Sequence, residues 1–497
     1  MGYIGATEDE AACRAARSGD TRLHFDSGSQ PRPTHNRQNH EMPTEIRSYI
    51  RSLGIGAYVV GGAVRDQLLG IPHADEDFLV PGVDQAGLRV LLESHGRVED
   101  MEVHGQLVGV RLFPRDRLVR SLAPAGIELT PPRAELSTGP GHRDFAIVSD
   151  AAIELEEDMA RRDFTINAMA IPLDGGDVFD PFGGRADLER RELRTVGPTS
   201  FEEDPLRLVR ALRFVSQLGF DLAPQTLAQM HTEAAGLAHV SAERIGGGIK
   251  ADGMGELSKL LLGQAPQRAL LLARDTGVLT QLIPEYAAAI GYGLDSSRQP
   301  LPLEEHLFTV VQIAADDRAG LAVRLAALVH DLGKPEADAD AEDVSHAAVG
   351  ARVADRILRR LRYPTRVRHH VVRIVAAHSF KLDGVPVGLF ARRFLAAHGA
   401  ELARDLVAHK AADLRAKSVP ERELESLALL AATIDRENSQ PHRIADLAIT
   451  GDDLQAIGFA EGPPLGRTLQ TLLDHVIDDP ARNERGWLLD RAAQELA

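Results

Sequence analysis

The chain has 497 residues, of which 56 are Lys or Arg and 73 are Asp or Glu, so its formal net charge at pH 7 is -17. This length exceeds one ordinary hydrophobic core, and an aromatic fraction of 4% favours a multi-domain, mostly helical protein. A single cysteine, Cys13, excludes an internal disulfide framework and a zinc site built from several cysteines. The negative charge argues against non-specific nucleic-acid binding but permits a local basic track.

The first part of the chain is polar and lacks periodicity. Residues 1–42 are therefore predicted to form a disordered extension. Met42 directly precedes a helix-like segment with proline at its start, which leads to the hypothesis that translation begins there. No apolar run approaches the roughly 20 residues of a membrane span, and the N-terminus lacks the apolar core of a signal peptide. We therefore expect a cytoplasmic protein without a membrane partner.

Residues 58–82, YVVGGAVRDQLLGIPHADEDFLVPG, predict a strand, a glycine turn, a short helix and a second strand. Gly61 and Gly62 let the backbone approach a ligand closely, and the N–H groups at the following helix start attract phosphates. Arg65 adds positive charge one turn later. The pattern indicates a cradle for phosphate groups.

Paired carboxylates follow this cradle. Asp75 and Asp77 lie two apart at the start of the second strand, so both side chains project from one face. Such a pair suits two Mg²⁺ ions about 3.5 to 4 Å apart, which activate an attacking hydroxyl and stabilise a leaving pyrophosphate. Residues 126–130 predict a strand that brings Glu128 beside them as a third carboxylate, with an exposed strand residue as the alternative. Residues 134–146 are predicted to be a mobile loop.

From residue 185 onward the pattern is helical. Residues 203–214 predict one helix with proline in its first turn, and Asp204 and Arg207 lie three apart on one of its faces. An acceptor beside donors matches the amine and ring nitrogen of cytosine and adenine, and it rejects uracil and guanine. A surface salt bridge is the alternative interpretation.

Candidate metal ligands occur further along the chain on predicted helices, and residues 295–302 and 336–343 are predicted to be loops. They are His306, His330, Asp331 and Asp413. Neutral imidazoles and carboxylates bind divalent transition metals, and such a cluster can generate a hydroxide for phosphoester hydrolysis. The order of these residues indicates a second site, separate from the paired aspartates.

Several blocks together resemble one known family. GGAVRDQLLG followed by DED, RRDFTINAMA at 161–170, DPFGG at 180–184 and EEDPLRLVRALRF at 202–214 are similar to motifs of class II tRNA nucleotidyltransferases. These are the CCA-adding enzymes and bacterial poly(A) polymerases of the polymerase-beta superfamily. The chain departs from the family pattern at 246–248, where three glycines interrupt the usual sequence.

The resemblance implies that these blocks build one nucleotide site. Its expected residues are Asp75 and Asp77 for the metals; Gly61, Gly62 and Arg65 for the triphosphate; Arg162, Asp163 and Asn167 for the sugar and phosphates; and Asp204 and Arg207, supported by Arg210, for the base. The base would then be chosen by protein groups, without a nucleic-acid template.

HDLGK at 330–334 resembles the HD phosphohydrolase superfamily, in which the four candidate ligands named above hold the metal. His346 and His378 fall where binuclear members carry further histidines, and Lys334 is expected to meet a substrate phosphate. Ser345 stands where a glycine is usual. A degraded or structural HD domain is the alternative to a hydrolytic one.

The resemblance also implies an α+β fold with a small polymerase-beta-like head, built on a mixed sheet with helices, and an extended all-α remainder. Beyond the N-terminal extension, the expected domains are the head at 43–182, a helical neck and body that binds RNA and base at 183–300, the HD domain at 301–415 and a helical tail at 416–497.

The implied function is template-independent addition of CMP and AMP to the 3′ end of tRNA, from CTP and ATP, with Mg²⁺ as cofactor and a further divalent metal in the HD domain. A poly(A) polymerase or an enzyme adding only CC or only A is the alternative within the class. A metal-dependent phosphohydrolase with a nucleotide-binding head is the alternative from another class. The oligomeric state is expected to be a monomer or a homodimer.

Overall fold

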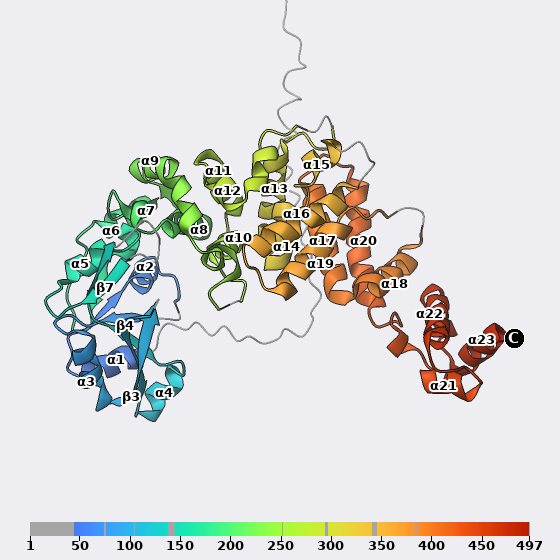
Figure 1. The fold of residues 1–497 in the computed structure, drawn as a ribbon, viewed down its shortest axis with the longest axis horizontal. Coiled ribbons are helices and arrows are strands. Elements are labelled where there is room, and N and C mark those ends of the chain that lie inside the picture. The colour runs from blue at the N-terminus through green and yellow to red at the C-terminus, as the bar shows by residue number, and fades with distance from the viewer. Residues whose placement is uncertain are drawn as a thin grey trace, which may run out of the picture.

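The computed structural model describes residues 44–73, 76–103, 105–137, 145–250, 252–293, 297–339, 345–382 and 385–496. The predicted N-terminal disorder and Asp75 therefore lie outside the described residues. The protein is elongated, with a sheet-containing head at one end and helices along the rest of its length (Figure 1). In the described part of the chain, no helix is both long enough and apolar enough to cross a bilayer.

The head is built on a six-stranded mixed sheet with the strand order β3-β4-β5-β2-β1-β8. Its strands are β1 (Tyr58–Val60), β2 (Asp77–Leu79), β3 (Gly96–Val103), β4 (Gln106–Pro114), β5 (Ile127–Thr130) and β8 (Ala170–Pro172). Strand β2 runs antiparallel to β1 and parallel to β5. Val59, Phe78 and Leu129, which are neighbours across three strands, are fully buried on one face, and Val60 and Leu79 are buried on the other, because both faces of the central strands are covered. The mixed sheet predicted for the head is confirmed.

Helices cover this sheet and extend the head. They are α1 (Thr44–Ser52), α2 (Gly62–Leu68), α3 (Gln85–Glu93), α4 (Arg117–Leu122), α5 (Leu155–Ala160) and α6 (Gly184–Arg190). The predicted loop at 134–146 is wrong at both ends, because β6 (Arg133–Ser137) and β7 (Phe145–Ser149) form an antiparallel pair. The glycine and proline residues that suggested a loop lie between these strands, at positions outside the described residues.

The neck follows the head. Its helices are α7 (Ser200–Glu203), α8 (Leu206–Leu218), α9 (Pro224–Glu233), α10 (Glu256–Leu261), α11 (Pro266–Asp275) and α12 (Val278–Leu282), and the short strands β9 (Glu192–Leu193) and β10 (Asp221–Leu222) pair in parallel. The single helix predicted for 203–214 is wrong. Asp204 is extended, with φ -140° and ψ 96°, because the ring of Pro205 disfavours helical geometry in the residue before it.

The HD region and the tail are helical. The HD helices are α13 (Leu303–Asp316), α14 (Leu321–Val329), α15 (Lys334–Ala339), α16 (His346–Arg360), α17 (Thr365–Ala377), α18 (Val387–His398), α19 (Ala400–Arg415) and α20 (Glu421–Glu437). The tail helices are α21 (Gly451–Ala456), α22 (Pro463–Asp478) and α23 (Arg485–Leu496), which have a buried cluster of their own. The loop predicted at 336–343 is wrong up to Ala339, since α15 extends to that residue.

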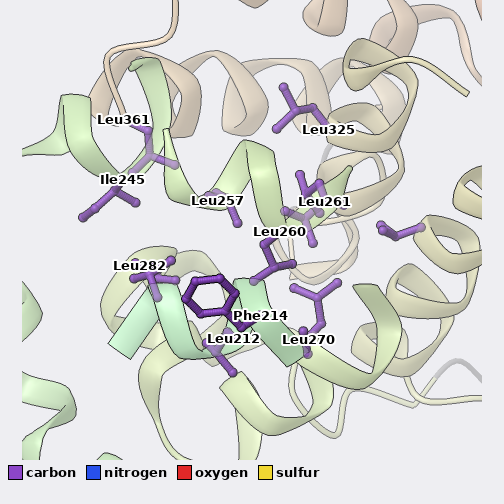
Figure 2. Packing of buried hydrophobic residues seen from close by; sticks show 14 of the residues in the cluster. Leu212, Phe214, Ile245, Leu257, Leu260, Leu261, Leu270, Leu282, Leu325 and Leu361 are labelled. Atoms are coloured by element: carbon purple, nitrogen blue, oxygen red, sulfur yellow. The ribbon is translucent and has the colours of Figure 1, made fainter. Parts of the chain in front are cut away.

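Neck and HD region share one hydrophobic core. Figure 2 shows Leu257 and Leu260 of α10 between α8 and residues of the HD region, including Leu325 and Leu361. The glycines at 246–248 let the backbone of the neck approach the backbone of the HD region. A Cβ on Gly247 would lie 1.9 Å from the carbonyl oxygen of Arg362, so the backbones approach more closely than any side chain allows. The departure from the family pattern therefore serves to join neck and HD region.

Candidate functional site

A cleft of 510 Å³ opens between the β1–α2 turn, the segment before β8 and helix α8. Its lining comprises seven arginines, three aspartates and five other residues: Arg65, Arg161, Arg162, Arg207, Arg210, Arg213, Arg244, Asp77, Asp163, Asp204, Gly61, Gly62, Asn167, Phe214 and Gln217. The structure thus brings together with Asp77 all the predicted triphosphate-, sugar- and base-binding residues, whereas Asp75 lies outside the described residues. These residues come from segments more than 100 positions apart in the sequence.

The glycine turn forms one wall of the cleft. Gly61 has φ 74°, a left-handed conformation that favours glycine, and a Cβ there would lie 2.8 Å from Nη1 of Arg162. Arg65, in the first turns of α2, donates from Nη1 to Oδ1 of Asn167 at 2.8 Å. The absence of a side chain at Gly61 therefore lets Arg162 approach the turn closely, while a Cβ on Gly62 would lie 3.5 Å from Nη2 of Arg65.

Asp163 holds the groups around it in place. Its Oδ2 accepts hydrogen bonds from Nε and Nη2 of Arg210 at 2.9 and 2.6 Å, and its Oδ1 accepts from Nδ2 of Asn167 at 2.9 Å. Burial opposes ionisation of this carboxyl, but the charge of Arg210 and the hydrogen bond from Asn167 outweigh it and lower the pKa of Asp163. Together with the contact between Asn167 and Arg65, these bonds connect α8 to α2 across the cleft.

A second buried carboxylate, Asp158 of α5, has the same role and was missed by the sequence analysis. Its Oδ1 accepts from Nε and Nη2 of Arg161 at 3.0 and 2.7 Å, and its Oδ2 accepts from Nη2 of Arg162 at 3.1 Å. Burial opposes the charge of Asp158, yet the two arginines lower its pKa. Its spacing of three and four residues from this arginine pair was the available signal.

Asp204 and Arg207 lie beside each other at the start of α8, although only Arg207 is helical. The Oδ2 atom of Asp204 accepts from Nη2 of Arg244 at 3.1 Å. The guanidinium of Arg207 donates from Nη1 to Oγ of Ser200 at 2.9 Å and from Nη2 to the carbonyl oxygen of Arg161 at 2.6 Å. Both side chains are therefore held in fixed positions at the cleft wall.

The cleft concentrates positive charge. Burial and the neighbouring Arg210 lower the pKa of Arg213 to about 10, because two guanidinium groups repel each other in a partly desolvated place. The guanidiniums of Arg213 and Arg65 lie 4.2 and 5.1 Å from the ring centroid of Phe214, whose π face attracts cations. A polyanion such as a triphosphate would relieve the remaining repulsion.

Two of the three predicted catalytic carboxylates, Asp77 and Glu128, lie among the described residues. Asp77 is exposed at the first position of β2 and lines the cleft. In the parallel pair β2–β5, Phe78 lies opposite Leu129, so Glu128 is the neighbour of Asp77 on the adjacent strand and on the same face of the sheet. However, Glu128 forms an ion pair with Arg111 of β4 and is not part of the cleft lining.

Glu76, between the two predicted metal ligands, is buried. Nε of Arg47 in α1 lies 3.0 Å from each of its carboxylate oxygens, and Nε2 of His73 lies 3.0 Å from Oε1. These contacts anchor the segment that leads into Asp77. Exposed carboxylate oxygens are ligands that Mg²⁺ prefers, so the chemistry of Asp77 fits this ion.

The second predicted site is assembled inside the HD region. His306 of α13, His330 and Asp331 after α14, and Asp413 of α19 each offer a ligand atom, and these atoms lie within 4.8 Å of one another. Nε2 of His306 is 3.1 Å from Oδ1 of Asp413, and Nε2 of His330 is 3.3 Å from Oδ2 of Asp331. All four residues are buried.

Further groups surround these four. Asp331, His346 and His378 form a second set of potential ligands that shares Asp331 with the first. Lys334 and Lys417 place their Nζ atoms 2.6 Å from Asp331 and Asp413, respectively. Lys334, expected to meet a substrate phosphate, thus contacts a carboxylate of the cluster.

His409, one turn before Asp413, was missed by the sequence analysis. Its side chain is fully buried, its ring centroid is 4.7 Å from that of His330, and neither of its nitrogens has a hydrogen-bond partner among the described residues. Nδ1 of His306 and Oδ2 of Asp413 likewise have none there. Unpartnered buried polar atoms are costly, so their concentration fits a site that binds a cation.

The charge of the cluster favours such a cation. Burial opposes protonation of His330, but Asp331 and Asp413 outweigh it and raise its pKa to about 9. The same negative potential would stabilise a divalent ion.

Comparison with known proteins places the chain in a family. The multifunctional CCA protein of Dechloromonas aromatica is 37% identical over 317 residues, which are 63% of this chain and 70% of the relative. That of Ralstonia nicotianae is 36% identical over 337 residues, covering 66% and 72% of the two chains. This chain belongs to the CCA protein family. It is therefore an enzyme of the nucleotidyltransferase class.

Models of three domain families match successive parts of this CCA family member. Residues 57–194 match the poly(A) polymerase head domain, 219–290 match a probable RNA- and SrmB-binding site of polymerase A, and 303–437 match the HD domain. The cleft lies mainly within the first match, with α8 between the first and second.

Solved structures of CCA-adding enzymes share the fold. The Bacillus stearothermophilus enzyme in complex with CTP is 27% identical, with a TM-score of 0.63 over 92% of this chain and 99% of that one. The Thermotoga maritima enzyme complexed with tRNA is 19% identical, with a TM-score of 0.54 over 91% and 95%, a likeness that shows the fold alone.

Proposed function

We propose that this CCA family member adds CMP and AMP to the 3′ end of tRNA without a nucleic-acid template, using CTP, ATP and Mg²⁺. The observation that carries this proposal is the cleft in which seven arginines surround Asp77, Asp204 and the glycine turn. The names of its relatives, the CTP complex of the Bacillus stearothermophilus enzyme and the tRNA complex of the Thermotoga maritima enzyme support the choice of substrates.

In the proposed reaction, the arginines of the cleft bind the triphosphate, and Gly61 and Gly62 allow it to approach the backbone. Asp77 and Asp75 would hold Mg²⁺, which supplies activation of the attacking hydroxyl and stabilisation of the leaving pyrophosphate. Glu128 is proposed as a third carboxylate because its strand register places it next to Asp77. The RNA 3′ hydroxyl then displaces pyrophosphate from the α-phosphorus of the bound nucleotide.

Base selection is assigned to Asp204 and Arg207. Arg244 fixes the carboxylate, while Ser200 and the backbone of Arg161 fix the guanidinium. A rigid acceptor beside a rigid donor serves as a template for cytosine and adenine, because both bases present an amine next to a ring-nitrogen acceptor. Asp163, Asn167 and the arginines they hold are proposed to contact the sugar and phosphates.

The decisive experiment supplies purified protein with tRNA ending before CCA, with tRNA ending at CC, and with an unrelated RNA, each with CTP or ATP alone and with both. The proposal predicts CC addition to the first tRNA, A addition to the second and complete CCA when both nucleotides are present. Long A tails on the unrelated RNA would instead establish a poly(A) polymerase. Addition confined to CC or to A would establish a partial enzyme.

A second activity is supported by a separate observation, the buried cluster of unpartnered imidazole and carboxylate atoms. We infer that His306, His330, Asp331 and Asp413 hold a divalent metal and that the HD region hydrolyses phosphoesters. The test measures hydrolysis of 2′,3′-cyclic AMP after chelation and after addition of Mn²⁺, Ni²⁺ or Mg²⁺. Absence of metal-dependent hydrolysis, combined with intact CCA addition, would show that the HD site is structural.

The remaining expectations stay proposals. We propose the boundaries 43–182, 183–300, 301–415 and 416–497 for head, neck, HD region and tail, together with the N-terminal extension. The HD match to residue 437 and the packing of α20 on α19 favour moving the third boundary past α20. A cytoplasmic location is proposed on the basis of the tRNA substrate, and the oligomeric state is proposed to be a monomer or a homodimer.

A further inference from the structure

A second basic surface lies on helix α16 of the HD region. It surrounds a hollow of 530 Å³ lined by five arginines and one aspartate: Arg352, Arg356, Arg359, Arg360, Arg362 and Asp355. The first four arginines are spaced at i, i+4, i+7 and i+8 and so share one face of the helix. The opposite face is apolar and packs into the core through residues such as Val353 and Ile357. We refer to these five arginines as the α16 surface.

The ion pairs of the α16 surface do not fully neutralise its positive charge. Arg356 and Arg360 both contact Glu285, and Arg359 contacts Asp355. At the two ends of the surface, Arg352 lies 3.7 Å from Glu336 and Arg362 lies 3.8 Å from Glu243, distances beyond a hydrogen bond. The five arginines thus face four acids, two of them beyond hydrogen-bonding distance, so this face keeps a small excess of positive charge on a chain of net charge -17.

One end of the α16 surface approaches the nucleotide cleft. Arg362 faces Glu243, and the next residue of the neck, Arg244, lines the cleft and contacts Asp204. Figure 1 shows α10 between α8 and the HD helices, and the packing of α10 against both α8 and α14 agrees with this view. Arg362 of the second hollow and Arg244 of the first are therefore linked through Glu243, the residue that precedes Arg244.

The junction is built to hold this arrangement. Arg362 has φ 58°, a left-handed conformation that is unfavourable for a side chain of this kind. The N–H of Gly247 donates to the carbonyl oxygen of Leu361 at 2.9 Å, which fastens the end of α16 to the neck.

We propose that the α16 surface binds the phosphate backbone of the RNA substrate and continues into the cleft as one basic track. This inference rests on the proposed function and names the part of the molecule that holds the RNA beyond its 3′ end. From Arg352 to Arg360 the helix rises by about 12 Å, at roughly 1.5 Å per residue. Exposed arginines over such a length suit an extended polyanion, and an RNA helix is recognised largely through its phosphates and 2′-hydroxyls.

The test is the double variant Arg352→Gln/Arg359→Gln, since both side chains are more than 60% exposed. The matched control is Arg404→Gln/Arg436→Gln, on α19 and α20, which removes the same charge at two exposed arginines. Binding of tRNA ending before CCA is measured over a range of salt concentrations. We expect affinity to fall about tenfold and the salt slope to decrease by roughly 0.7 to 0.9 for each lost phosphate contact.

The rate measurements separate this surface from the catalytic cleft. The Arg352→Gln/Arg359→Gln protein should show a KM for tRNA raised about tenfold, while kcat and the KM for CTP stay within about twofold. Arg352→Lys/Arg359→Lys should restore binding, because a phosphate contact of this kind needs the positive charge. The control double variant should bind as the unmodified protein does.

Equal tRNA affinity and salt slope in the α16 and control variants would overturn the inference, whether both are unchanged or both are weakened. Unchanged RNA binding would also be the result if the surface served a protein partner. Failure of the proposed function looks different, because the unmodified protein would then incorporate no CMP. The binding measurement does not depend on incorporation and still decides whether the α16 surface holds RNA.

Discussion

The cleft and the HD cluster both gather charged groups, but they satisfy those groups in opposite ways. In the cleft, carboxylates such as Asp158 and Asp163 are buried and fully engaged in holding arginines, whose guanidiniums line an open space. In the HD cluster, imidazole and carboxylate atoms converge in a closed interior, and several have no hydrogen-bond partner among the described residues. The first arrangement is ready for an anion, and the second is ready for a cation.

This difference shows what preorganisation means at each site. The cleft fixes its cations through an inner layer of carboxylates, so a triphosphate enters a space already shaped for it. The HD cluster gains most from a metal, because an ion would satisfy several costly atoms at once. The two sites should therefore respond separately to substitutions, and the following predictions test that separation.

The largest effect is expected from Asp77→Asn. Loss of one carboxylate at the head of the cleft removes a proposed Mg²⁺ ligand, so CMP incorporation should fall by about a thousandfold or more. Hydrolysis of 2′,3′-cyclic AMP should not change. Asp84→Asn is the control, because Asp84 caps α3 by accepting a hydrogen bond from the N–H of Gly87, and asparagine caps helices about equally well, so incorporation and stability should both stay unchanged.

Glu128→Gln tests the proposed third carboxylate of the same site. Glu128 should contribute less to metal binding than Asp77, because its carboxylate is already paired with Arg111. We expect incorporation to fall by about tenfold to a hundredfold. Full activity of this variant would mean that the ion pair with Arg111 is its whole role.

Asp331→Asn is expected to have the largest effect on the HD site, and that effect should be confined to the HD region. Asp331 belongs to both sets of potential ligands, so metal-dependent hydrolysis should fall by more than about a hundredfold while CCA addition stays within about twofold. Asp405→Asn is the control, because Asp405 lies outside the cluster and also contacts a histidine, with its Oδ2 2.7 Å from Nε2 of His370. Parallel loss of both activities would contradict the independence of the two sites.

Asp163→Asn should act on nucleotide binding. The amide keeps the volume but weakens the charge-assisted bonds to Arg210, which are worth about 1.5 to 3 kcal/mol, so the KM for CTP and ATP should rise by about tenfold or more. The exposed Asp221→Asn, which loses an ion pair with Arg268, serves as the control. An unchanged KM would show that Arg210 keeps its position without the carboxylate.

The smallest effect is expected from His409→Leu. Because neither ring nitrogen has a partner among the described residues, a leucine of similar volume should leave the metal-free Tm unchanged or raise it by a few degrees. If His409 belongs to the metal site, the rise in Tm on adding Mn²⁺ or Ni²⁺ should be smaller in the variant. An undiminished metal-induced rise would assign His409 to packing alone.

The sequence predicted much of the head because its signals are local. The strand and helix around Gly61 and Gly62 followed from an apolar run, a glycine pair and a helical spacing. The break at Asp204 was missed even though the cause, Pro205, was visible, because the acids and arginines around it favour a continuous helix. The β6–β7 pair was missed because turn residues between two short strands resemble a longer loop.

The site residues also divide into those with a local sequence signal and those without one. Those within motifs were found, whereas Asp158, Arg244 and His409 were missed, since each matters only through a neighbour supplied by the fold. The sequence by itself determined the chemistry available, namely arginines for phosphate and histidines with aspartates for a metal. Only the tertiary structure decided which carboxylates are buried as supports and which face the cleft, because burial and pairing depend on contacts between segments far apart in the chain.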